Sequence, residues 1–295
     1  MTSKLQSLKA FLAGAQRFAL VEVADAKGST PRETGTTMLV STTGTHGTIG
    51  GGQLEYMAID KARQLLSPRR GKSTGAPLFD ADRLATTLDI PLGPEIGQCC
   101  GGRVAVSIRL GDPEIAADLV QREEGEEERL PHLYIFGGGH VGHAMAASCA
   151  LMPVRTIVVD TRADALEGLP EGVEARLTPV PEDVVRDAPS CSAFAVLTHD
   201  HALDFLIVAE ALQRTDTAYV GMIGSKTKKA TFKSWFLKTA GGTEAEFARL
   251  VSPIGGDGVK DKRPTVIAAL AAAEIMTAFA LQPAPAPGVR TRAAG

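Results

Sequence analysis

The chain has 295 residues, and at roughly 150 residues per domain this length predicts about two domains. Hydrophobic residues make up 44% of it and charged residues 22%, the balance of an ordinary globular protein, and a formal net charge of −3 argues against a general affinity for nucleic acid. Four cysteines are too few to hold a chain of this length together as a disulfide scaffold, so we expect a reduced, cytoplasmic protein.

Short apolar and β-branched runs in the first half of the chain predict strands. They lie at Phe18–Val23, Thr37–Val40 and Arg103–Ile108. Apolar residues recur at helical spacing from about Gln53 to Leu66 and predict a helix there. We therefore expect a mixed α/β domain over residues 1–110.

Residues 111–131 are rich in charge and poor in apolar side chains. The core of this stretch, Arg122–Arg129, contains five glutamates. Such a composition is typical of a solvated helix end or a linker, and we assign it as a charged linker between two domains.

Strands and helices alternate in the second half. Strand-type apolar runs occur at Leu133–Phe136, Arg155–Val159, Ala193–Leu197 and Ala218–Ile223. A helical stretch over about Val141–Leu151 follows the first of them. Because strands that alternate with helices form a parallel sheet covered on both faces, residues 132–281 are expected to form a Rossmann-like domain.

Two stretches near the C-terminus carry further predictions. Val266–Leu281 is rich in alanine and interrupted by Glu274, so we expect it to be too short and too weakly apolar to span a membrane, and we expect no membrane association. Residues 282–295 contain three prolines and are expected to form a flexible tail.

The run Gly137-Gly-Gly-His-Val-Gly142 has the spacing of a dinucleotide fingerprint. Gly137 would permit the tight turn, Gly139 the approach of a phosphate, and Gly142 the close packing of helix on strand. His140 lies at the expected helix start, where unpaired N–H groups attract an anion. Asp160 follows 18 residues after Gly142, where a carboxylate can bind ribose hydroxyls. We expect a nucleotide here; the alternative is that the glycines only shape a turn.

Three runs in the first half are rich in small residues and hydrogen-bond donors: Lys27–Arg32, Thr48–Glu55 and Gly97–Gly102. The glycines at 50, 51 and 52 open the predicted helix that contains Glu55, so their backbone is expected to cradle an anion. Arg32 can hold a phosphate through two parallel hydrogen bonds.

Cys99 and Cys100 are adjacent in the third run, where they follow Gln98. Thiolates are soft ligands, and the flanking glycines permit close approach to a metal or sulfur atom. The two-residue spacing typical of zinc or redox pairs is absent. The alternative is an ordinary turn before the strand at Arg103. Together the three runs suit an anionic ligand that also contains a metal or sulfur atom to which a thiolate can bind.

Two weaker signals follow predicted strands. Thr198–His201 with Asp204 is similar to the metal-binding run of metallo-β-lactamase-like hydrolases, but Ala202 and Leu203 stand where further ligands are needed. We therefore expect no binuclear metal site and favour contact with a bound nucleotide or phosphate. Lys226 either helps to bind a phosphate or belongs to a solvated basic helix face.

Several of these runs together carry a family resemblance. They are Gly28–Arg32, Ile49–Glu55, Gln98–Gly102, Gly137–Gly142 with Asp160, Thr198–His201 with Gly221–Ser225, and Gly258–Pro264. In these residues the chain resembles the XdhC/CoxI family, the accessory proteins of molybdenum hydroxylases such as xanthine dehydrogenase.

The resemblance implies a protein that is not itself an enzyme but binds and protects molybdenum cofactor, which is molybdopterin with its metal. It would present the cofactor to a cysteine desulfurase, which replaces an oxo ligand by sulfur, and would help to insert the product into the molybdenum-binding subunit of xanthine dehydrogenase. A homodimer is also implied. Molybdenum would meet Cys99 or Cys100. The residues expected to bind the cofactor are Arg32, Gly50, Gly51, Gly52, Glu55, Gln98, Cys99 and Cys100.

Two other functions stay open from the residues. An NAD(P)-dependent oxidoreductase would use the Gly137 turn and Asp160, with His199 or His201 as a proton donor, but it leaves the cysteine pair without a role. A redox or metal-storage protein would use the cysteines alone.

Overall fold

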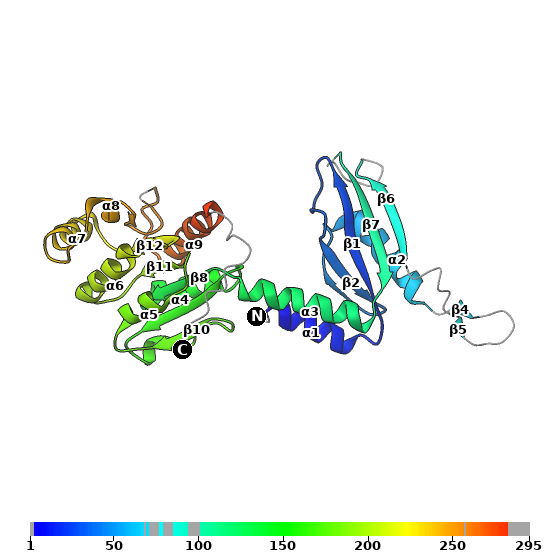
Figure 1. Ribbon diagram of the computed structural model, residues 1–295, viewed down its shortest axis with the longest axis horizontal. Coiled ribbons are helices and arrows are strands. Elements are labelled where there is room, and N and C mark those ends of the chain that lie inside the picture. Colours follow the sequence, from blue (N-terminus) through cyan, green and yellow to red (C-terminus); the bar gives the residue numbers. More distant parts are fainter. Residues whose placement is uncertain are drawn as a thin grey trace. The chain divides into compact units, whose positions relative to one another are not determined.

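The computed structural model describes residues 3–67, 69–70, 77–78, 85–93, 101–256 and 258–282, with only the backbone described at 69–70 and 77–78. The chain forms two compact units, Thr2–Glu128 and Arg129–Gly295 (Figure 1). Each unit has its own sheet and its own hydrophobic core.

The first unit is built on an antiparallel sheet with the strand order β3-β2-β1-β7-β6. Its elements are α1 (Lys4–Gly14), β1 (Phe18–Lys27), β2 (Thr37–Ser41), β3 (Thr45–Gly47), α2 (Gly52–Leu66), β4 (Arg69–Arg70), β5 (Pro77–Leu78), β6 (Ala85–Pro91), β7 (Arg103–Leu110) and α3 (Pro113–Glu128). The three strands and the helix predicted in this half are confirmed, and the mixed α/β class with them.

The two faces of this sheet are covered by different helices. Alternate residues of β1 point to opposite faces, so that Val21 meets α2 while Leu20 meets α1 and α3. Helix α2 buries one stripe at four-residue spacing, formed by Leu54, Ala58, Ala62 and Leu66. The sheet is therefore buried on both faces, and its loops lie at the edges.

The charged stretch that we assigned as a linker contains α3, which belongs to the first unit. Asp112 begins this helix by accepting a hydrogen bond from the backbone N–H of Ile115 at 2.8 Å. Leu119 lies in the core beside α1. On the side that faces α1, the Nζ of Lys4 lies 2.7 Å from a carboxylate oxygen of Glu123. The other four glutamates of the stretch are exposed and form the solvated side of a helix whose other side is buried.

The second unit contains a parallel sheet with the strand order β10-β9-β8-β11-β12-β13. Its elements are β8 (His132–Phe136), α4 (His140–Cys149), β9 (Arg155–Asp160), the 3₁₀ helix η3 (Asp164–Leu166), β10 (Glu174–Leu177), α5 (Pro181–Asp187), β11 (Ala193–Val196), α6 (His201–Gln213), β12 (Tyr219–Met222), α7 (Lys226–Lys238), α8 (Glu244–Phe247), β13 (Leu250–Val251) and α9 (Pro264–Leu281). Counted within the unit, this is the 3-2-1-4-5-6 order of a Rossmann fold, which confirms the predicted domain type.

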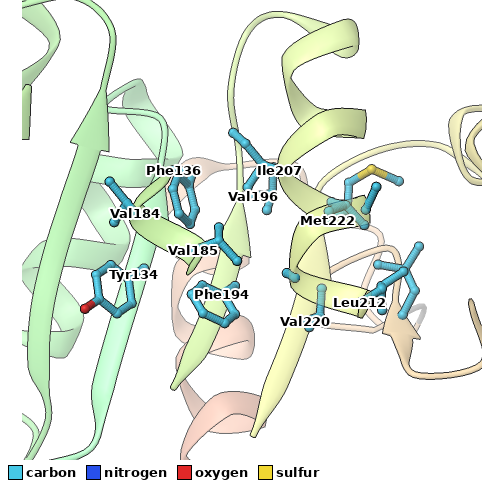
Figure 2. Packing of buried hydrophobic residues seen from close by; sticks show 14 of the residues in the cluster. Tyr134, Phe136, Val184, Val185, Phe194, Val196, Ile207, Leu212, Val220 and Met222 are labelled. Carbon is cyan, nitrogen blue, oxygen red and sulfur yellow. The ribbon is translucent and has the colours of Figure 1, made fainter. Parts of the chain in front are cut away.

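Helices cover both faces of this sheet. On one face, α5, α6 and α7 pack over Tyr134, Phe136 and Phe194, whose rings lie side by side (Figure 2). On the other face, α4 and α9 pack over Ile135 and Val158. The central strands are buried on both sides, which explains why they read as continuous apolar runs.

Helix α9 corrects one expectation. It is 18 residues long with a mean hydropathy of 1.8, so by length and composition alone it meets the requirement for a membrane span. One side of it packs on the domain: Ala268, Ala272 and Ile275 are buried against α4 and the sheet, while 22% of the helix as a whole is buried. The carboxylate of Glu274 accepts hydrogen bonds from the Tyr219 hydroxyl at 2.8 Å and from the Gly255 N–H at 2.9 Å.

Candidate functional site

The glycine-rich runs of the first unit come together in space. A Cβ added at Gly50 would lie 2.7 Å from the ring of Pro31. A Cβ added at Gly102 would lie 2.7 Å from the carbonyl oxygen of Lys27 and would overlap that of Ser29. The Lys27–Arg32 segment therefore contacts both of the other runs, and only glycine fits at these two contacts. Of the third run, the structure describes the last two glycines.

Gln98, Cys99 and Cys100 lie outside the described residues. Gly101 and Gly102 follow them directly in the sequence and are held to the sheet edge, because Gly101 donates a backbone hydrogen bond to Leu92 at 2.9 Å. The expected role of the cysteines stays a prediction.

Glu55 does not face an open anion cradle. One of its carboxylate oxygens, Oε2, accepts hydrogen bonds from the backbone N–H groups of Ile49 and Gly51, each at 3.1 Å, and from the Thr48 hydroxyl. The N–H of Gly50 donates to the Thr48 hydroxyl oxygen at 3.1 Å. The donors that we expected to hold a phosphate are thus taken by groups of the same chain.

Part of the cluster is nevertheless open. Gly51 and Gly101 have positive φ values of 75° and 66°, and a Cβ added at either would meet no atom within 4 Å. Arg32 is exposed, and its Cγ lies 3.7 Å from the Cβ position of Gly50. A ligand that approaches this surface would meet two glycines without side chains and one guanidinium group.

The Gly137 turn of the second unit has the three features of a dinucleotide fingerprint. Gly137 has a φ of 114° and passes so close to Leu197 that a Cβ would lie 2.6 Å from its carbonyl oxygen. A Cβ at Gly142 would overlap the carbonyl oxygen of Gly137. Gly139 caps α4, is exposed, and has no atom within 4 Å of its Cβ position. His140 begins α4 and is exposed. This backbone leaves room for a phosphate.

Asp160 ends β9 directly beside this turn, with 6% of its surface exposed. Its carboxylate accepts hydrogen bonds from the Gly138 N–H at 2.8 Å, from the Arg162 N–H at 3.0 Å, and from the Arg162 guanidinium at 3.2 and 3.3 Å. Burial alone would raise the pKa of Asp160, but the hydrogen bonds from Arg162 and Gly138 hold that pKa below its ordinary value.

The ribose-binding position is therefore already paired. A nucleotide ribose would have to replace the Arg162 side chain on the carboxylate. A small pocket adjoins this carboxylate at the carboxyl edge of the sheet. It is lined by Phe136, Val159, Asp160, Thr161, Pro181, Thr198, His199 and Leu203.

Two residues that the sequence did not single out as a pair organise the same edge. Asp204 is fully buried and forms an ion pair with Lys228, whose side chain is 8% exposed. The other oxygen of Asp204 accepts from the Thr198 N–H at 3.0 Å and from its hydroxyl at 2.7 Å. Lys228 also donates to the carbonyl oxygen of Ile223 at 3.0 Å. The pair ties the ends of β11 and β12 together.

The histidine run lies where we expected, at the carboxyl edge of the sheet. His199 and His201 are exposed, and Asp200 caps α6 by accepting from the Ala202 N–H at 2.8 Å. Within the described residues there is no group of three histidine, cysteine or acidic side chains placed to hold a metal ion. Lys228, on the same helix as Lys226, pairs with a buried carboxylate at this edge, and the role expected of Lys226 stays a prediction.

Comparison with known proteins places this chain in a family. Residues 133–275 match the model described as the XdhC Rossmann domain, and residues 11–74 match the model of the XdhC and CoxI family. The chain belongs to the XdhC/CoxI family. In this XdhC/CoxI protein, Arg32 and Glu55 fall within residues 11–74 and Asp160 within residues 133–275, whereas Gln98–Cys100 lie between the two matched ranges.

Two similar proteins show how far the likeness extends. The first is an uncharacterized protein of Escherichia coli K12, YqeB, which is 28% identical over 268 residues. The match covers 88% of this chain but 43% of YqeB, so this chain spans less than half of that relative. The second is a solved structure described as a xanthine dehydrogenase from Bacillus halodurans, with a TM-score of 0.75 and 17% identity over 97% of this chain and 98% of that one. That likeness shows a shared fold.

Proposed function

We propose that this XdhC/CoxI protein is an accessory factor in the maturation of xanthine dehydrogenase and not itself an enzyme. It binds molybdenum cofactor, protects it, presents it to a cysteine desulfurase for sulfuration, and delivers it to the molybdenum-binding subunit of the dehydrogenase. It acts in the cytoplasm as a homodimer. The observation that carries the proposal is the convergence of the glycine-rich runs in the first unit.

The described residues fit the phosphate end of this cofactor. Arg32 offers a charged, planar donor beside the Gly50 turn, and Gly51 and Gly101 have no side chain that would block the approach of a ligand. Molybdenum and the dithiolene sulfurs of the cofactor favour soft ligands, which Cys99 or Cys100 would supply. What this chain contributes is binding and orientation.

The Rossmann unit gives this proposal a second ligand, a nucleotide. The strand order and the open backbone at Gly139 support it. The same features favour one alternative function, an NAD(P)-dependent oxidoreductase. The pairing of Asp160 with Arg162 weighs against a dinucleotide that binds through its ribose hydroxyls. Fluorescence titration with NADH or NADPH, followed by an assay for hydride transfer, separates simple binding from catalysis.

The decisive experiment measures the pterin carried by the protein. The full chain is produced in a host that makes molybdopterin and is purified without oxygen, and the oxidised pterin that it releases is identified by fluorescence and mass spectrometry. We expect bound pterin in the wild type and its loss in a Cys99→Ala/Cys100→Ala variant. The matched control is Cys191→Ala, which removes an exposed cysteine of the other unit. Full retention by the double variant would refute the role of the cysteines.

A further inference from the structure

The turn before α2 is held by one oxygen atom of Glu55. Three donors, the N–H groups of Ile49 and Gly51 and the hydroxyl of Thr48, converge on that atom. Backbone N–H groups at a helix N-terminus carry partial positive charge and attract an anion. Here the anion is a side chain of the first turn of the same helix.

We infer that Glu55 is a positioning residue that sets the shape of the loop cluster and does not itself touch the ligand. This inference rests on the proposed function, because the cluster is the proposed cofactor site. An external phosphate that approached the N-terminus of α2 would have to displace a carboxylate that already has three donors. The phosphate of the ligand is therefore bound beside this turn, by Arg32, and not at the turn.

Contacts between the loops couple the position of the turn that Glu55 holds to the positions of the other two runs. Gly50 lies in the turn that Glu55 holds, and it packs so closely on Pro31 that an added Cβ would lie 2.7 Å from the proline ring. A shift of the turn therefore moves Pro31 and with it Arg32. The same segment reaches back to Gly102 through Lys27 and Ser29. Because these contacts are backbone against backbone or against a proline ring, the loops cannot move independently.

Two substitutions separate positioning from direct contact. Glu55→Gln keeps a carbonyl oxygen that can accept the same three hydrogen bonds but removes the charge. Glu55→Ala removes both the acceptor and the charge. Asp60→Ala is the matched control, because Asp60 is an exposed acid of the same helix that accepts a hydrogen bond from Gln64.

The first readout is amide hydrogen exchange at Ile49 and Gly51, and it needs no cofactor. We expect exchange to rise about tenfold or more in Glu55→Ala, the size expected for loss of a charge-assisted hydrogen bond, and to change less than about threefold in Glu55→Gln and Asp60→Ala. Unchanged exchange in Glu55→Ala would overturn the inference. Should this variant not fold, Thr48→Ala removes one of the three donors and is expected to raise exchange at Gly50 and Gly51 in the same direction.

The second readout is the pterin content of the purified variants. We expect Glu55→Gln to retain pterin within about threefold of the wild type and Glu55→Ala to lose about tenfold. Equal loss in both variants would mean that the charge contacts the ligand. Tighter binding of inorganic phosphate by Glu55→Gln would mean that the turn is the phosphate site. Either result overturns the inference, whereas a wild type without pterin refutes the proposed function and leaves the exchange result standing.

Discussion

Replacement of Lys228 by methionine tests whether the buried ion pair holds the edge of the Rossmann sheet. Asp204 is fully buried, so the substitution leaves a carboxylate in the interior with only the two donors of Thr198. Loss of one partner of a buried ion pair costs about 3–5 kcal/mol. A unit of this size loses about 2–4 °C of Tm per kcal/mol, so we expect the Tm of the second unit to fall by about 6–20 °C.

Trp235 makes this measurement specific to the unit. It is the single tryptophan of the chain, and it lies on α7 together with Lys228. Its fluorescence during thermal or urea unfolding therefore reports on the second unit alone. Lys238→Met, at the exposed end of the same helix, is the control and should cost less than about 0.5 kcal/mol. A loss below about 1 kcal/mol for Lys228→Met would refute the reasoning, because that is the value of a pair exposed to solvent.

Three further outcomes follow from the same structure. Gly142→Ala should unfold or strongly destabilise the second unit in a thermal melt, because its Cβ would overlap the Gly137 carbonyl, whereas Gly139→Ala should leave the Tm unchanged and weaken nucleotide binding in a titration. The pKa of Asp160 is lowered in the fold, so its contribution to stability is present above the unfolded pKa of about 3.9 and is lost as the pH falls through the folded value. In urea unfolding, Asp160→Asn should therefore have a lower free energy of unfolding than the wild type at pH 7, and the two values should converge at strongly acidic pH. Burial raises the pKa of Cys149 to about 11, so in native protein at pH 8 a thiol reagent should leave Cys149 unmodified while it labels the exposed Cys191, as peptide mass spectrometry would show.

Much of the fold could be predicted because its signals are local. The strands of the Rossmann unit are continuous apolar runs, and the glycines after β8 have a fixed spacing that determines a turn. Helix α3 was assigned to a linker because its glutamates outweighed the apolar stripe that includes Ile115 and Leu119. That stripe, with Asp112 as its cap, has the four-residue spacing and the N-terminal residue typical of a helix.

The candidate site was less accessible to sequence reasoning, because its contacts join distant segments. Asp204 and Lys228 are 24 residues apart on different helices, and no sequence pattern in either helix predicts that these two side chains pair. Glu55 is different: an acidic side chain in the first turn of a helix often bonds back to the backbone before it, so its local role was within reach. That the three runs meet depends on the antiparallel order of the sheet, which the sequence does not state.

The single acidic residue of α9 determines which way this helix faces. The apolar residues of α9 are distributed around its whole circumference. Burial of apolar surface would therefore favour several rotations of the helix about its axis to nearly the same degree. In the observed rotation, Glu274 meets the Tyr219 hydroxyl and the Gly255 N–H. In any other rotation the buried Tyr219 hydroxyl and the Gly255 N–H would lose this acceptor, and a polar group left unpaired in the interior is costly. The residue that interrupts the apolar run thus gives the helix a unique orientation, which hydrophobicity alone would not supply.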